Sequence, residues 1–240
     1  MRPGLSPAQR IERDLAALEG LALPGAAAFF RALAREDEPY ELGLAHTEPG
    51  DSWLVSYNPR RRDSDFRQRA LRALGAQGLP VEVVEELFSR LKPEQCSTVV
   101  GLELSPGQRS ATVYVEELDR FGLDHDFIND LSGLIPTTGG QPYILAVDLP
   151  SLRWKAYGLH ERAPGLLPEL EGPGAAAWIE QRCSHGGLKL YRCFDYFGGH
   201  PGPAPSIELP WPRPRVTSIG GRLHPRPATT TYWCVSGPDE

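Results

Sequence analysis

The sequence predicts an α+β fold in which ten antiparallel strands form a closed barrel with helices outside it. Helical segments alternate along the chain with paired strand-like segments, so that five hairpins follow one another. The 25 glycines and 24 prolines are typical of a chain with many turns and disfavour a helical bundle. Because antiparallel strands in one open sheet would leave two unpaired edges, we expect closure into a barrel, which removes both.

The first segment of the chain has the signals of a helix start. Ser6 is a suitable N-cap, Pro7 fits the first helical turn, and Gln9 completes a reciprocal cap. Apolar residues follow at helical spacing up to Leu21, and a second such run covers about 26–35. We therefore expect a helical lead-in over about 6–35. It lacks the apolar stretch of a secretory signal, so a cytoplasmic protein is expected.

The rest of the chain repeats a unit of helix and hairpin. Alternating apolar and polar residues, separated by turn residues, predict the strands. The expected hairpins span about 39–58, 97–116, 143–159, 180–197 and 215–235. The helices expected between them span about 64–75, 80–92, 124–134 and 173–182. Prolines disfavour regular structure over 198–214, and the whole chain, 1–240, is expected to form one domain.

Composition argues against two classes of partner. The formal net charge is −6, and the only basic run, 60–62, follows a predicted strand, so a nucleic-acid partner is not expected. No stretch approaches the roughly 18 apolar residues that a membrane-spanning helix needs. We therefore expect neither nucleic-acid binding nor a membrane span.

Neither the cysteines nor the acidic residues form a recognisable metal motif. The four cysteines lack C-x-x-C spacing and are expected to be small core residues. Cys183 and His185 lie close in sequence, but a pair without further ligands is weak evidence for a metal. Asp124, Asp126 and Asp130 are better placed to cap and open a helix than to hold Mg²⁺. No metal site is therefore expected.

Two predicted strands place cationic and aromatic side chains on the same face. Residues two apart in a strand point the same way, which groups Lys155 with Tyr157 and Lys189 with Tyr191. Arg153 joins the first group. The residues that alternate with them suit contact with an outer helical layer: Trp154, Ala156, Leu188 and Leu190. We expect the cations and tyrosines to face the lumen, which in a ten-stranded barrel can hold a small ligand.

A tyrosine recurs near the end of five predicted strands, one in each hairpin. A single strand tyrosine is most often a packing residue, but the repetition favours a shared aromatic lining. The five residues are Tyr57, Tyr114, Tyr157, Tyr191 and Tyr232.

Five hairpins with intervening helices, and strands of the form Arg-x-Lys-x-Tyr and Lys-x-Tyr, resemble the ABBA aromatic prenyltransferases, in particular the indole (dimethylallyltryptophan synthase) branch. The resemblance implies a PT barrel, a ten-stranded barrel whose lumen holds an allylic diphosphate under a shield of tyrosines. It implies that Arg153, Lys155 and Lys189 bind the diphosphate, and that the five recurring tyrosines form the shield. Such a shield would stabilise an allyl cation.

The indole branch also has a carboxylate on its first strand that accepts the indole N–H. The segment 39–43 resembles the surrounding motif, with Gly43 in place of a serine. The resemblance implies that Glu41 orients and deprotonates the aromatic acceptor. It implies no cofactor and no metal, with a prenyl diphosphate as co-substrate and a small aromatic molecule or a peptide as acceptor.

Two other hypotheses fit the same residues. The barrel could bind a small anionic or aromatic ligand without catalysis, or the proline-rich segment 198–214 could be recognised by another protein. Gly139-Gly140 and Gly220-Gly221 are expected to lie in turns, and no phosphate-binding glycine loop or G-x-S-x-G elbow is present.

Overall fold

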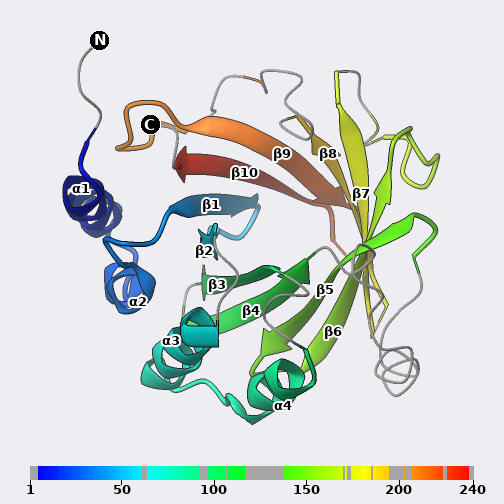
Figure 1. Cartoon of the computed structure of the whole chain (residues 1–240). Helices are drawn as coiled ribbons and strands as arrows, with labels where there is room; N and C mark the ends of the chain where they lie inside the picture. The colour runs from blue at the N-terminus through cyan, green and yellow to red at the C-terminus, as the bar shows by residue number, and fades with distance from the viewer. Residues whose placement is uncertain are drawn as a thin grey trace.

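In the computed structural model, ten antiparallel strands form a closed barrel (Figure 1). The described residues are 5–60, 64–91, 97–105, 107–116, 138–169, 171, 174–184, 186–194, 203, 207–223 and 226–237. Strands consecutive in sequence pair with each other, and the first strand also pairs with the last. The strands are β1 (Tyr40–Glu48), β2 (Ser52–Pro59), β3 (Ser97–Ser105), β4 (Gln108–Glu116), β5 (Gln141–Leu149), β6 (Arg153–His160), β7 (Ala177–Cys183), β8 (Leu188–Cys193), β9 (Arg215–Arg222) and β10 (Ala228–Ser236). The predicted barrel is therefore confirmed.

The helices of the described part of the chain lie outside the barrel (Figure 1). They are α1 (Pro7–Gly20), α2 (Ala26–Leu33), α3 (Ser64–Ala76) and α4 (Glu82–Arg90). Ser6 and Gln9 form the expected capping box at the start of α1. None of these helices is long and apolar enough to cross a membrane.

The described residues test one of the two helices expected later in the chain. The one over 124–134 lies outside the described residues. The helix expected over 173–182 is wrong, because 177–183 is strand β7. Its backbone is paired on both sides, with β6 and with β8. The alanines before Trp178 favour a helix locally, and the pairing on both edges of the strand overrides that preference.

The main hydrophobic core lies between the helices and the outer face of the barrel. It joins residues of the helices, such as Phe30 of α2, to outward residues of the strands, such as Leu44 and Val147. Trp154 belongs to this core, as its alternation with Lys155 predicts. A smaller cluster lies on the inward face of later strands, and its buried members are Ala146, Tyr157, Ala177, Tyr191 and Cys193. Strand alternation thus separates the packing core from the lumen.

Asp14 links α1 to the first residue of β1 and to the segment that precedes β9. Its side chain is fully buried. The carboxylate accepts hydrogen bonds from the Tyr40 hydroxyl at 2.7 Å and from Trp211 Nε1 at 2.9 Å. Arg13 completes an ion pair with it at 2.9 Å. Since a buried carboxylate is costly without such partners, the contacts fix where α1 docks, beside the start of β1 and ahead of β9.

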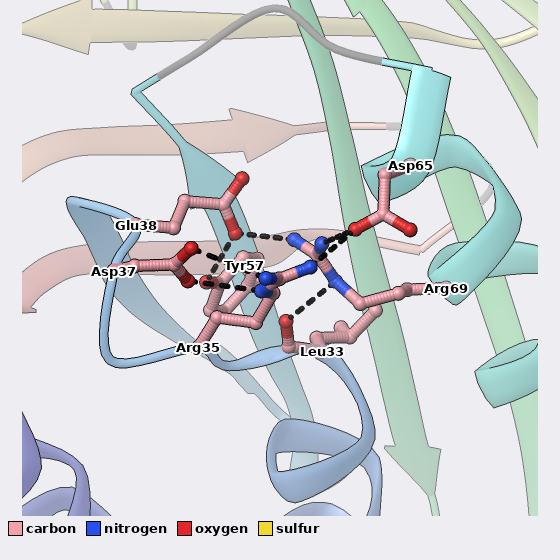
Figure 2. Close-up of polar contacts among 7 residues, drawn as sticks. All are labelled: Leu33, Arg35, Asp37, Glu38, Tyr57, Asp65 and Arg69. Carbon is pink, nitrogen blue, oxygen red and sulfur yellow. Dashed lines mark hydrogen bonds and ion pairs between the residues drawn. The ribbon is translucent and has the colours of Figure 1, made fainter.

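A second buried ion pair joins α3 to the segment that precedes β1 (Figure 2). Arg69 contacts Glu38, and the two side chains are only 8% and 5% exposed. Arg69 also donates to the carbonyl oxygen of Leu33 at 3.1 Å and contacts Asp65. Glu38 accepts a hydrogen bond from the Tyr57 hydroxyl at 3.3 Å. The cluster therefore holds α2, α3 and β2 together.

Arg69→Leu is expected to lower the free energy of unfolding by about 3–5 kcal/mol, because the buried Glu38 carboxylate loses the cation with which it forms an ion pair. Arg31→Leu is the matched control: the Arg31–Glu19 pair is 64% and 60% exposed, and its loss should change stability by less than about 1 kcal/mol. Urea unfolding followed by circular dichroism measures both. Equal losses in the two variants would contradict the role of the buried pair.

Candidate active site

The lumen of the barrel contains two connected chambers. The large chamber has a volume of about 440 Å³, and every strand contributes to its lining. The small chamber has a volume of about 50 Å³ and is lined by residues of eight of the strands, β5 and β9 excepted. Four tyrosines line both chambers: Tyr114, Tyr157, Tyr191 and Tyr232. This tyrosine belt therefore lies where the chambers meet.

The tyrosine belt is a continuous series of ring contacts. The ring centroids of Tyr114 and Tyr157 are 6.2 Å apart, those of Tyr157 and Tyr191 6.5 Å, and those of Tyr191 and Tyr232 5.6 Å. The four residues come from β4, β6, β8 and β10, one from the second strand of each of the last four hairpins. The belt thus offers several aromatic faces to one ligand.

The belt tyrosines are held as neutral phenols. Burial raises the pKa of Tyr232 to about 12 and the pKa of Tyr114, Tyr157 and Tyr191 well above the usual range. The Tyr191 hydroxyl donates a hydrogen bond to Gln181 Oε1. The four neutral rings present their faces to the lumen at any physiological pH.

Gly220 makes room for the belt. It lies directly opposite Tyr191 in the pairing of β8 and β9, and a Cβ atom there would be 2.1 Å from Tyr191 Cδ1. The expectation of a turn at 220–221 is wrong, because both glycines lie within β9. A glycine in a strand interior often marks such a close approach.

The small chamber is lined by two lysines and one carboxylate. Lys155 and Lys189 line it together with Glu103 and Thr112. Lys155 Nζ lies 2.6 Å from Asp148 Oδ1, and the Thr112 hydroxyl donates to the same oxygen at 2.6 Å. Lys155 is therefore already paired with an internal anion.

Lys189 and Arg222 differ from Lys155 in their partners. Among the described residues, Lys189 has no ion pair or hydrogen bond, and Arg222 Nε is buried without a hydrogen-bond partner. Burial, together with the charges of Lys155 and Arg222, lowers the pKa of Lys189 to about 8. Desolvated cationic groups without partners favour binding of an anion.

Glu41 lies in the large chamber. Its carboxylate contacts the Arg60 guanidinium, and both residues line that chamber but not the small one. Along β1, Glu41 is followed by Ala45 and Thr47, which line the small chamber. Glu41 and the lysines therefore lie on opposite sides of the tyrosine belt.

Two of the predicted site residues lie elsewhere. Tyr57 is outside the barrel: its ring packs against Phe66 at 5.7 Å and its hydroxyl contacts Glu38, so the expectation that it faces the lumen is wrong (Figure 2). Its neighbours Ser56 and Asn58 face the lumen instead. Arg153 is 52% exposed, with its guanidinium 3.8 Å from Asp148 Oδ2, and does not line either chamber.

Sequence reasoning missed the charged residues that strand pairing brings close to the two lysines of the small chamber. Asp148 lies opposite Thr112 of β4, and Gly221, next to Arg222, lies opposite Leu190 of β8. The polar alternation of Thr112, Tyr114 and Glu116 is a sequence signal that β4 has a hydrophilic inward face. No comparable pattern marks Asp148 or Arg222, because their neighbours in the site belong to other strands.

Comparisons with known proteins bear on the fold. No protein-family model matches the sequence, and no curated protein is significantly similar to it. Among solved structures, 26 chains are similar in fold. One is the crystal structure of AnaPT from Neosartorya fischeri, with a TM-score of 0.53 and 12% identity, over 86% of this chain and 80% of that chain. The chain has the PT-barrel fold.

The PT barrel gives the chambers a common framework, and the side chains within it belong to this sequence. Within the described ranges, no three His, Cys, Asp or Glu residues are grouped as metal ligands. Asp124, Asp126 and Asp130, considered above as a magnesium cluster, lie outside those ranges. The described lumen offers cations, neutral phenols and carboxylates.

Anion binding in the small chamber is expected to weaken as the pH rises through about 8, because Lys189 loses its charge there. Isothermal titration calorimetry with inorganic pyrophosphate between about pH 7 and pH 9.5 measures this. Lys189→Arg should retain its affinity over that range, since a guanidinium stays charged. Lys155→Arg is the control and should keep the wild-type profile.

The comparison between the variants separates Lys189 from other titrations. Glu103 and Cys183 also influence Lys189, and pyrophosphate itself gains charge as the pH rises. These contributions are shared by all three proteins. An unchanged profile in Lys189→Arg would contradict the role of Lys189.

Proposed function

We propose that the protein transfers a dimethylallyl or longer prenyl group from an allylic diphosphate to an indole or another electron-rich aromatic acceptor, without a metal cofactor. The observation that carries this proposal is the order of groups in the lumen: unpartnered cations, then four tyrosines, then Glu41. The PT-barrel fold, which the chain shares with the aromatic prenyltransferase AnaPT, supports the same class of reaction.

In the first step, the bond between the prenyl carbon and the diphosphate oxygen breaks, and its electron pair leaves with the diphosphate. Lys189 and Arg222 stabilise the leaving group, with Arg222 able to donate two hydrogen bonds to it. These cations take the part that Mg²⁺ has in metal-dependent prenyl transfer. The positive charge that remains on the allyl group lies against the tyrosine belt.

The belt has two effects on the allyl cation. Each desolvated tyrosine face attracts the cation by about 2 kcal/mol through its π electrons. The ring contacts from Tyr114 to Tyr232 also exclude water, which would otherwise convert the cation to a prenyl alcohol. Both effects direct the cation towards the acceptor.

In the second step, a carbon of the aromatic ring attacks the allyl cation and a new carbon–carbon bond forms. The proton on that carbon passes to a base, and Glu41 is the carboxylate of the large chamber that we assign to this role. Glu41 also accepts the indole N–H and so orients the ring. Arg60 positions Glu41 through their ion pair.

The direct test is incubation of the protein with dimethylallyl and geranyl diphosphates and a panel of acceptors, with EDTA present. The panel consists of tryptophan, tyrosine, cyclic dipeptides and short peptides, and mass spectrometry detects the product. Prenylated product in EDTA is expected. Absence of product with every acceptor, or a strict requirement for Mg²⁺, would contradict the proposal.

Glu41→Gln is expected to lower kcat by about 10²–10⁴-fold while leaving pyrophosphate affinity unchanged, because it removes the base but lies away from the small chamber. Stopped-time product assays and calorimetry measure the two quantities. A barrel that only binds its ligand would instead show no turnover in the parent protein and little effect of Glu41→Gln on ligand affinity.

Gly220→Ala is expected to raise the fraction of prenyl alcohol among the products several-fold. The new methyl group would displace the Tyr191 ring, from which it would be 2.1 Å away, and open the belt to water. Gly75→Ala, in helix α3, is the control, since no other atom lies within 4 Å of the added carbon there. Chromatography of both products gives the ratio. An unchanged ratio in Gly220→Ala would show that the belt does not exclude water.

A further inference from the structure

Tyr191 is the residue that makes the tyrosine belt continuous. Two of the three ring contacts involve it, with Tyr157 at 6.5 Å and with Tyr232 at 5.6 Å between ring centroids. The third contact joins Tyr114 to Tyr157. If the Tyr191 ring moved, Tyr232 would be separated from the other belt tyrosines. The position of this one ring therefore decides whether the belt is closed.

Gly220 gives the Tyr191 ring its space but cannot fix its angle. The two residues lie opposite each other in the pairing of β8 and β9, and an added Cβ atom would be 2.1 Å from Tyr191 Cδ1. A glycine permits this close approach, yet it has no side chain against which the ring could interlock. The far end of the tyrosine side chain must be held by another group.

Gln181 holds that end. The Tyr191 hydroxyl donates a hydrogen bond to Gln181 Oε1, and the Gln181 side chain is only 3% exposed. A buried hydroxyl is unfavourable without such an acceptor. The Tyr191 hydroxyl also interacts with that of Tyr232. The bond to Gln181 therefore influences two members of the belt.

Cys183 sets the orientation of the Gln181 amide. Gln181 Nε2 donates to Cys183 Sγ at 3.3 Å, which leaves Oε1 to face Tyr191. The orientation matters because the oxygen of a carboxamide only accepts hydrogen bonds and its nitrogen only donates them. The three side chains thus form a series from β7 to the belt, in which each holds the next.

Strand pairing places Gln181 where the belt meets the lysines. It lies opposite Tyr157 of β6 on one side and opposite Lys189 of β8 on the other. It lines the small chamber and not the large one. In the proposed reaction this boundary is where the bond between the prenyl carbon and the diphosphate oxygen breaks. Tyr191 is then one of the first aromatic faces that the allyl cation meets.

We infer that Gln181 is a positioning residue, which fixes Tyr191 and so keeps the belt closed to water while the allyl cation exists. The positioning stands on the contacts alone, and its effect on the products rests on the proposed function. Where the belt opens, a water oxygen forms the bond to the allyl carbon and a proton passes to solvent. The product is then a prenyl alcohol in place of the prenylated acceptor.

Fluorine NMR tests the positioning without any turnover. The protein is labelled with 3-fluorotyrosine at its eight tyrosines, and the Tyr191 resonance is the one missing from Tyr191→Phe. Gln181→Met keeps an unbranched side chain of similar length and removes the accepting oxygen, so the Tyr191 resonance should shift or broaden. Gln77→Met is the control, since its oxygen accepts a hydrogen bond from Arg109 on the surface, and it should leave that resonance unchanged.

Product analysis with dimethylallyl diphosphate and an indole acceptor tests the consequence. Gln181→Met should raise the ratio of prenyl alcohol to prenylated acceptor several-fold. Both products come from the same cation, so the ratio does not depend on how tightly the donor binds. Tyr191→Phe should raise the ratio similarly, and the double variant no further, because the two substitutions remove the same hydrogen bond. Tyr191→Phe also keeps the inference testable if Gln181→Met fails to fold.

An unchanged Tyr191 resonance in Gln181→Met would overturn the inference. So would an unchanged product ratio in Gln181→Met or in Tyr191→Phe, or increases that add in the double variant. A different result separates this inference from the proposed function. If the resonance changes as expected but the parent protein prenylates no acceptor, prenyl transfer is overturned and the positioning of Tyr191 by Gln181 is supported.

Discussion

The pairing of β1 with β10 is the interaction on which the rest of the structure depends. β1 is paired along its length with β2 on one side and with β10 on the other, so the sheet has no free edge. The pairing places Ala45 of β1 opposite Tyr232 of β10, and so brings the last belt tyrosine into the lumen. α1 reinforces this seam: Arg10 donates to the carbonyl oxygen of Gly237 at 3.0 Å, and Asp14 binds Tyr40.

Closure divides the side chains of every strand into two sets with different physical roles. The outward set packs against the helices and forms the main core, with Trp233 and Val147 among its buried members. The inward set forms the chambers. Tyr57 and Tyr157 illustrate the difference, since the first packs among Phe30, Tyr40 and Phe66 and the second lies in the tyrosine belt. Stability and ligand binding therefore depend on alternate positions of the same strands.

The lumen retains charge that the fold does not neutralise. Desolvation of Lys189 beside Lys155 and Arg222 is unfavourable in the empty barrel, and the lowered pKa of Lys189 is a direct consequence. Asp148 and Glu103 reduce the cost by offsetting part of the charge, and they also reduce the charge left for a ligand.

The sequence by itself determined the five hairpins, the closed barrel, and the lumen position of Lys155, Tyr157, Lys189 and Tyr191, because turn residues and strand alternation are local properties. Tertiary structure decided which face of β2 is inward, and so excluded Tyr57 from the belt. It also made 177–183 a strand, placed Gly220 under Tyr191, and brought Asp148 and Arg222 to the lysines. Register and face depend on pairing between distant segments, where a shift of one residue exchanges the two faces. No local pattern carries that information.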